Sequence, residues 1–339
     1  MPVFDEYIGI DWTGALPARG IAIAWVRPDD GVVRLVPSPG RHWTRRAAMD
    51  WVGDRLLRHR QMGTRALVGI DCGFALPYVP GTGYLDGRAA GVDDLFALWD
   101  LVDMAAGAGP GADDFCGTPA LADPRLGPSF WVAGRRPPHW TDAEGGGKRR
   151  LVELVAARTG MGTPVSVFNL ASASKQVGKA SLAGMRALRY LKDRMGKGLA
   201  VWPAQAPLAT DGGAASVVTE IYPTLFRRRA HGLAKIRDWS AMAAALARLE
   251  CGLASQDGTE QDGGSHAGTA APPTFDDHAG DAMIAAAGMM RWAVRDDVWA
   301  PKGLDTGTAR REGWIFGVTG DMSGDVEAVL RDGPAGGGT

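Results

Sequence analysis

The tripeptide Gly-Ile-Asp occurs twice near the start of this 339-residue chain, as Gly9–Asp11 and Gly69–Asp71. Each copy closes a short apolar run that is typical of a buried β-strand. Strands are depleted in aspartate, and a buried carboxylate without a partner is strongly disfavoured. If the two strands are neighbours, Asp11 and Asp71 meet at one edge of a sheet. Such a pair is hard to explain structurally, and it indicates a divalent-metal site.

The first 70 residues predict the order strand, strand, strand, helix, strand. The predicted strands cover 7–11, 21–26, 32–36 and 66–71, and the helix covers 44–60 with Thr44 as its cap. Later segments predict strands at 165–168, 199–202 and 216–222 and helices at 92–105, 151–158, 181–194, 239–253 and 275–294. This alternation indicates an α/β fold built on a mixed sheet.

The organisation predicted along the chain is that of one domain over residues 1–330. Between about 75 and 215 the pattern weakens and glycine and proline are frequent, so we expect a large insertion there. Residues at about 254–273 are polar and glycine-rich, which indicates a mobile loop. The tail at 331–339 is expected to be disordered.

Composition limits the partners. Lysine and arginine number 37 against 38 aspartates and glutamates, so the chain does not coat nucleic acid by charge alone, although a local basic groove stays possible. The three cysteines are widely spaced, which is typical of reduced thiols in a cytoplasmic protein. There is no basic leader followed by an apolar segment and no apolar stretch of about 18 residues, so neither a signal peptide nor a membrane span is expected.

The helix predicted at 275–294 is apolar on nearly every side, which is typical of a buried helix. It nevertheless carries Asp277 and Asp281, which are four residues apart and share one face. Asp277 has a structural explanation, because Thr274 can cap the helix and an acid in the first turn stabilises it. Asp281 lies in the second turn and has no such explanation, so we expect it to be functional. Asp276 is the alternative to Asp277 as the acid that faces the site.

Two further residues are candidates. Glu220 ends a β-branched run that Pro223 terminates. It is either an edge-strand residue facing water or another acid at the same sheet edge. His278 lies near the helix face that carries Asp281. It is either a metal ligand or proton carrier, or a solvent-exposed histidine in the first helical turn.

Basic side chains gather around the helix predicted at 181–194. Lys175 and Lys179 lie in a loop of small residues before it, and Arg186 and Arg189 recur on one face of it. Such a stripe is either a solvated face or a contact for the phosphates of nucleic acid. We therefore regard these four residues as candidate substrate-binding residues.

Five segments together resemble a known family, and they span nearly the whole chain: Ile8–Ala15, Val68–Pro77, Thr219–Pro223, Asp277–Ala282 and Glu312–Gly317. In this order they are similar to an uncharacterised bacterial family of predicted RNase H-like nucleases, domain of unknown function 429, in the resolvase-like branch of the RNase H fold. The resemblance implies a mixed five-stranded sheet flanked by helices, with a large insertion after the fourth strand.

The resemblance also implies a metal-dependent nuclease. Its catalytic acids would be Asp11, Asp71, Glu220, Asp277 and Asp281. Of these acids, all but Asp277 would hold two Mg²⁺ or Mn²⁺ ions for phosphodiester hydrolysis. Ligand sets made only of oxygen suit these ions better than zinc. The expected partner is a nucleic acid or a nucleotide.

Two alternatives stay open. The first is a nucleotide-binding phosphotransferase of the sugar-kinase/actin type, which also uses an aspartate and a glycine turn after core strands to hold phosphates. A second β-β-β-α unit within residues 75–215 would favour it. The second alternative is a non-catalytic binding module on the same fold.

Overall fold

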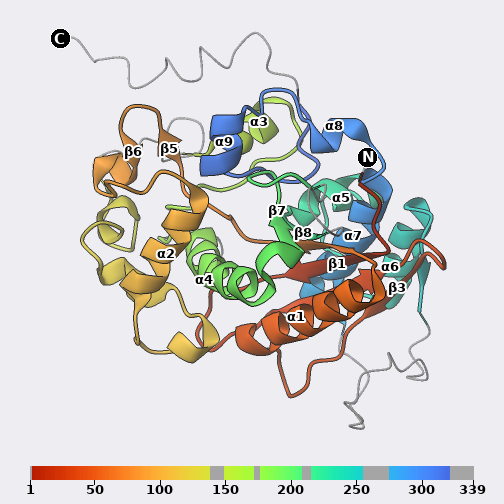
Figure 1. Ribbon diagram of the computed structural model, residues 1–339. Coiled ribbons are helices and arrows are strands. Elements are labelled where there is room, and N and C mark those ends of the chain that lie inside the picture. The colour runs from red at the N-terminus through yellow and green to blue at the C-terminus, as the bar shows by residue number, and fades with distance from the viewer. Residues whose placement is uncertain (1, 138–148, 172–175, 208–214, 255–274, 321–339) are drawn as a thin grey trace.

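The main sheet in Figure 1 mixes parallel and antiparallel strands. It comes from a computed structural model that describes residues 2–137, 149–171, 176–207, 215–254 and 275–320. Across the described residues the sheet has seven strands in the order β7-β8-β4-β1-β2-β3-β9. Their bounds are β1 Glu6–Asp11, β2 Ala22–Val26, β3 Val32–Leu35, β4 Ala66–Ile70, β7 Leu199–Val201, β8 Ser216–Glu220 and β9 Gly252–Leu253. A separate hairpin pairs β5 Tyr78–Val79 with β6 Gly83–Tyr84.

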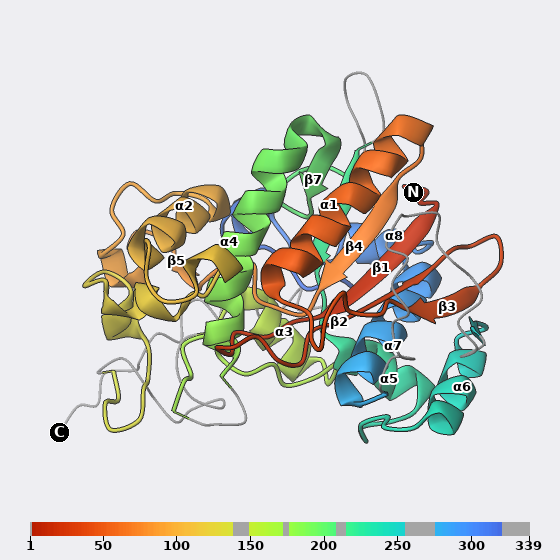
Figure 2. The same ribbon diagram turned by 90° about the horizontal axis from the view of Figure 1, so that it is seen from below.

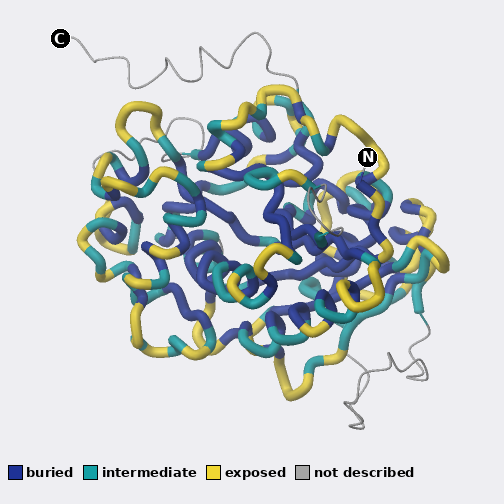
Figure 3. The backbone as a smooth tube through the Cα atoms, viewed as in Figure 1, coloured by how far each residue is buried: buried dark blue, intermediate teal, exposed yellow. Residues whose placement is uncertain are grey.

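The helices cover both faces of this sheet. Their bounds are α1 Arg45–Met62, α2 Leu95–Ala106, α3 Leu151–Arg158, α4 Val177–Met195, α5 Pro223–Ala230, α6 Trp239–Arg248, α7 Asp277–Trp292, α8 Asp296–Trp299 and α9 Thr306–Arg311. Figure 2 shows α1 and α4 on one side of β1 and β4, with α7 and α5 on the other side. The strands between them are buried almost throughout, as Figure 3 shows.

The predicted β-β-β-α-β opening is confirmed. The strands β1, β2 and β3 pair in antiparallel fashion, and α1 then returns the chain so that β4 lies parallel to β1. Thr44 caps α1 as expected, since its side chain accepts a hydrogen bond from Ala47 N at 3.0 Å. Gly63 ends the helix in the left-handed conformation, with φ of 68°.

Several sequence expectations need correction. The sheet has seven strands among the described residues, not five, because β7 pairs with β8 and β9 with β3. Such short edge strands are defined by distant partners and not by their own composition. The strand expected at 165–168 is absent from that described segment, where Phe168 instead packs against Phe130 in a loop. Two short helices, α8 and α9, follow α7.

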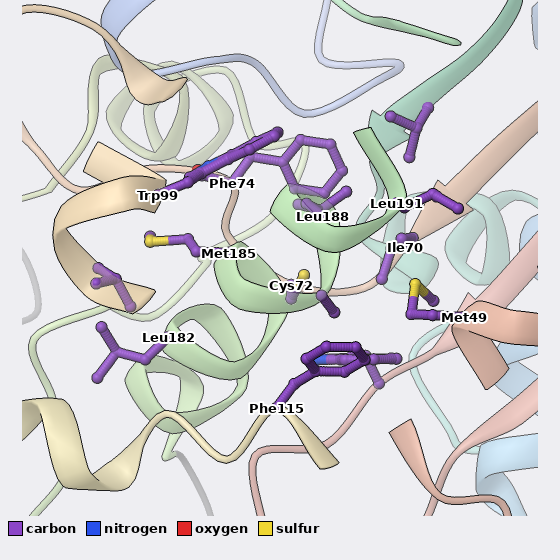
Figure 4. Close-up of a cluster of buried hydrophobic side chains, with 14 of the residues drawn as sticks. Met49, Ile70, Cys72, Phe74, Trp99, Phe115, Leu182, Met185, Leu188 and Leu191 are labelled. Carbon is purple, nitrogen blue, oxygen red and sulfur yellow. The ribbon is translucent and has the colours of Figure 1, made fainter. Parts of the chain in front are cut away.

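The two faces of the sheet carry separate cores. Ile70 of β4 packs with Met49 of α1 and with Leu188 and Leu191 of α4, which lies within the segment expected to be an insertion (Figure 4). The opposite core is built around α7, whose residues 279–290 are all buried, as its apolar composition predicted. Since α4 covers the sheet and β7 extends it, the described part of residues 75–215 is integral to this architecture.

Close packing explains the glycine of the first Gly-Ile-Asp. A Cβ on Gly9 would lie 2.4 Å from the Ala282 carbonyl oxygen of α7, so any larger residue would push this helix off the sheet. The neighbouring Ile8 and Ile10 enter the α1–α4 core. Because side chains alternate along a strand, Asp11 points to the same side as Gly9, toward α7. The motif therefore sets both the approach of α7 and the direction of the carboxylate.

Three remaining expectations concern the chain as a whole. The loop expected at about 254–273, except for Ala254, and the tail at 331–339 lie outside the described residues. All helices within the described ranges are too short or too polar to cross a membrane. Cys72, Cys116 and Cys251 are buried thiols that form no disulfide.

Candidate active site

Asp11 and Asp71 lie side by side at the ends of neighbouring parallel strands. Ile10 of β1 is in register with Ile70 of β4, and Asp71 N donates a hydrogen bond to Ile10 O at 2.9 Å. Adjacent strands are about 4.8 Å apart, so the two carboxylates are close neighbours. Asp11 is buried, with 7% of its surface exposed, and Asp71 is partly buried. The sheet thus brings together the two acids that the repeated motif predicted.

Helix α7 brings two more residues to the same place. His278 lies in its first turn, and His278 Nδ1 is 2.6 Å from Asp11 Oδ2. Asp281 follows one turn later and is buried, with 4% of its surface exposed. Arg227 of α5 donates a hydrogen bond to Asp281 Oδ1, and Lys235 donates one to Asp281 Oδ2. Asp281 is therefore near the strand-end pair, but two cations of the chain already neutralise it.

Glu220 reaches the site from a different side. It is in register with Ile70, one residue earlier than the position of Asp71, so it points to the opposite face of the sheet from Asp11 and Asp71. Arg150 binds both of its carboxylate oxygens, at 2.5 and 2.6 Å, and Phe74 N donates a further hydrogen bond at 2.9 Å. The alternative of an edge-strand residue facing water is wrong, because Glu220 is buried beside Ile70 of β4 and Ile315 and is paired with Arg150.

The first turn of α7 is arranged differently from the sequence expectation. Asp276, not Thr274, is the N-cap, and its side chain accepts a hydrogen bond from Ala279 N at 2.9 Å. Asp277 follows as the acid of the first turn, which the positive end of the helix dipole stabilises. Neither residue lines the cavity described below, whereas His278 does.

A cavity of about 490 Å³ opens at these strand ends. Its lining includes Asp71, Glu220 and His278, together with Gln176 and Lys179 from the start of α4. The remaining wall includes the loop after β1 and several apolar side chains, among them Val165, Ile221, Tyr222 and Ile315. Asp11 lies next to this cavity, held to His278 and beside Asp71.

The loop after β1 is fixed in place by close contacts. A Cβ on Gly14 would lie 2.1 Å from the backbone of Lys179, so only glycine lets the loop meet the start of α4. Arg45, which is fully buried, donates hydrogen bonds to Thr13 O at 3.1 Å and to Ala15 O at 2.7 Å. The backbone of this cavity wall is therefore rigidly positioned.

The electrostatics of the strand-end pair differ from those of the other acids. Burial, with the charge of Asp281, raises the pKa of Asp11 to about 6, although the hydrogen bond to His278 opposes this shift. Burial raises the pKa of Asp71 well above its usual range, and the charge of Asp11 adds to this effect. The hydrogen bond to Asp11 in turn raises the pKa of His278 to about 9. Asp11 and Asp71 thus resist being ionised together unless a cation joins them.

The residues fit one divalent cation. No hydrogen bond or ion pair joins the Asp71 carboxylate to another described side chain, which leaves its oxygens available. Mg²⁺ is commonly held by one or two carboxylates and completed by water and substrate phosphate. The larger site expected from the sequence is not assembled, since no three His, Cys, Asp or Glu side chains of the described residues are grouped to hold a metal ion.

The candidate substrate-binding residues separate into three groups. Lys179 lines the cavity, and no ion pair engages its ammonium within the described part of the chain. Arg186 is buried and binds Asp103 at 2.7 Å, and Arg189 binds Asp100 at 2.5 Å, so both join α4 to α2. These arginines of α4 therefore contact α2. They do not form a solvated face, which was the other interpretation of the sequence. Lys175 lies outside the described residues.

Sequence reasoning missed the basic residues that pair with the acids. Arg150, Arg227 and Lys235 come from three segments that carried no clear motif. Arg150 is 70 positions from Glu220, and Lys235 is 46 positions from Asp281, so local spacing in the sequence predicts neither pair. The available signal was indirect: a buried acid needs a partner, and each of these acids required one.

Comparisons with known proteins gave no match for this chain, whether with protein-family models, curated proteins or solved structures. The functional conclusion therefore depends on the geometry and electrostatics of the site.

Proposed function

We propose that this protein is a hydrolase of phosphodiesters that depends on a divalent cation, with Asp11 and Asp71 as the ligands of the ion. One observation carries this proposal: two adjacent strand-end carboxylates lie at a cavity, and burial and mutual repulsion disfavour their joint ionisation. A cation between them removes that penalty. Purely structural acids in this chain are instead paired with arginine, as Glu220 is with Arg150.

The walls of the cavity suit a phosphate ester. A Mg²⁺ or Mn²⁺ ion at Asp11 and Asp71 would polarise the phosphoryl group and supply a bound water as nucleophile. Lys179 also lines the cavity, and no ion pair among the described residues engages its ammonium, which suits a phosphate oxygen. His278, held by Asp11, presents a second positive charge at the acidic wall. Both cationic groups would attract the phosphate.

The cavity favours a substrate unit of nucleotide size. Its volume of about 490 Å³ falls in the range of small-ligand pockets, and Tyr222 and Val165 give it an apolar wall for a base or sugar. A duplex would require a row of free cations along its phosphates. The arginines of α4 do not provide that row, because Arg186 and Arg189 are engaged by α2. The proposed substrate is a nucleotide diester or the end of a nucleic-acid chain.

The fold agrees with the family resemblance. The β-β-β-α-β opening, with β4 beside β1 and β8 beside β4, supports an RNase H-like core that β7 and β9 extend at its two edges. The phosphotransferase alternative required a second β-β-β-α unit in that segment. Its described part holds only the β5–β6 hairpin and β7 as strands, which disfavours this alternative.

The decisive experiment measures Mn²⁺-dependent hydrolysis of bis(p-nitrophenyl) phosphate and of a panel of single-stranded DNA, RNA and dinucleotides. Wild-type protein should cleave with Mn²⁺ and not with EDTA, and Asp11→Asn should reduce the rate to background while the circular dichroism spectrum is retained. Asp29→Asn, at an exposed turn between β2 and β3, is the matched control and should cleave normally. Equal rates for wild type and Asp11→Asn would reject the proposed site.

A further inference from the structure

Lys235 is a cation of the chain placed among the acids of the site. It lies between α5 and α6, and its side chain is 40% exposed. Its ammonium donates a hydrogen bond to Asp281 Oδ2, while Arg227 binds Asp281 Oδ1. Both oxygens of the late-helix acid are therefore engaged from within the protein.

The charge of Lys235 also acts on the strand-end pair. It opposes the upward pKa shifts of both Asp11 and Asp71, so its ammonium lies within electrostatic range of all three aspartates. Two-metal hydrolases use one ion for the attacking water and a second for the leaving oxygen. In this chain, Asp281 and the strand-end pair are the acids expected to hold that second ion, and Lys235 is already bound there.

We propose that the ammonium of Lys235 takes the place of a second divalent cation, so that this site binds one ion and supplies the second positive charge from its own chain. The inference rests on the proposed function, because it assumes the ion at Asp11 and Asp71. Lys235 would compensate the charge of Asp281 that a second ion would otherwise balance, and its side chain is 40% exposed.

The balance of charge supports a single ion. The acids of the site are Asp11, Asp71, Glu220 and Asp281, and the permanent cations paired with two of them are Arg150, Arg227 and Lys235. In the remaining strand-end pair Asp11 is held by His278 and Asp71 has no cationic partner among the described side chains, so one divalent ion is enough to compensate the pair. A second ion would add two charges where the chain already supplies Arg227 and Lys235, and it would meet a carboxylate with both oxygens occupied.

Lys235 differs from an ordinary surface lysine in its partner. Exposed ion pairs contribute little to stability. The Asp281 side chain is only 6% exposed, so replacing Lys235 with an uncharged residue frees one oxygen of a buried carboxylate beside two others. A second divalent ion needs such a free carboxylate oxygen as a ligand.

The test counts bound ions. Mn²⁺ binding is measured by isothermal titration calorimetry and by electron paramagnetic resonance on the intact chain. We expect one Mn²⁺ for wild type, two for Lys235→Met and one for Lys235→Arg, which keeps the charge. Lys197→Met, at an exposed lysine outside the site, is the matched control and should bind one. Asp71→Asn should bind none.

The outcomes separate the two proposals. One ion in both wild type and Lys235→Met would reject the role of Lys235 and leave the proposed function standing. Two ions in wild type would also reject it. No ion in either protein would reject both proposals. If Lys235→Met fails to fold by circular dichroism, Lys235→Gln replaces it, and the wild-type count still discriminates.

Discussion

Strand β1 carries a buried carboxylate at each end, and the two carboxylates have different partners. Glu6, at the start, is fully buried and is bound by Arg55 at 2.6 and 2.7 Å and by His59 at 3.1 Å. Although burial by itself raises its pKa, these hydrogen bonds lower the pKa of Glu6 to about 2. At the end of the strand, burial and the charge of Asp281 raise the pKa of Asp11 to about 6, although the hydrogen bond to His278 opposes this shift.

This contrast distinguishes a structural acid from a functional one. Around Glu6 the chain provides more cationic partners than one carboxylate needs, which fixes α1 against the sheet. Asp11 has His278 as a partner and Asp71 has none among the described side chains, since Arg227 and Lys235 bind Asp281. We propose that this less compensated strand end is where an external cation and a phosphate act.

The largest expected effect comes from neutralising the functional end. Asp71→Asn should lower Mn²⁺-dependent phosphodiester cleavage by about 10³-fold or more, because the ion loses one of two protein ligands. In EDTA at pH 7 its free energy of unfolding should rise, since one of two repelling charges is gone. Initial rates and urea unfolding measure the two quantities. If Asp71→Asn lost stability but kept its cleavage rate, Asp71 would be a structural acid like Glu6.

Neutralising Glu6 should lower the stability of the protein and leave its cleavage rate nearly unchanged. Glu6→Gln leaves Arg55 buried without its charged partner, which should lower the free energy of unfolding by about 3 kcal/mol. Cleavage per folded molecule should stay within about twofold of wild type. Urea unfolding followed by circular dichroism, with rates measured below the transition, checks both. A loss of rate without a loss of stability would mean that the two ends are coupled.

The pH dependence of the free energy of unfolding should reflect both Asp11 and Glu6. In EDTA, Asp11 has a raised pKa, so stability should increase as pH falls from about 6 toward 4. Glu6 has a lowered pKa, so its contribution of roughly 3 kcal/mol is complete above pH 4.5 and is lost as pH falls toward 2.

Two variants separate these contributions. Asp11→Asn should weaken the gain between pH 6 and 4, and Glu6→Gln should weaken the loss below pH 4.5. Free energies of unfolding from urea titrations at each pH give the curve. A wild-type curve that falls steadily from pH 7 downward would contradict the assignment of opposite shifts.

The smallest effect is expected on the cationic wall. Lys179→Ala should raise KM by about tenfold and change kcat by less than about threefold, because the ammonium binds ground state and transition state alike. Arg189→Gln is the matched control. It removes a half-exposed ion pair, so the free energy of unfolding should fall by less than about 1 kcal/mol. KM should not change. Steady-state kinetics of both variants test whether the cavity, and not the α4 stripe, binds phosphate.

The sequence predicted much of the fold because its signals were local. The strands β1 to β4 follow from short apolar runs and turn residues, and the helix α1 from its apolar spacing and the Thr44 cap. The burial of α7 follows from its composition. The strand β7 was predicted at 199–202 but without a partner, and β9 was not predicted, because edge pairing depends on the distant strands β8 and β3.

For the site, the sequence by itself determined that Asp11 and Asp71 end core strands and that Asp281 sits on a buried helix. Tertiary structure alone decided which acids are compensated. Glu220 lies one residue out of step with Asp71, which turns it to the other face and toward Arg150. Lys235 and Arg227 reach Asp281 from distant segments. Charge pairing depends on distances in space, and these arise only when strand register and helix packing are fixed.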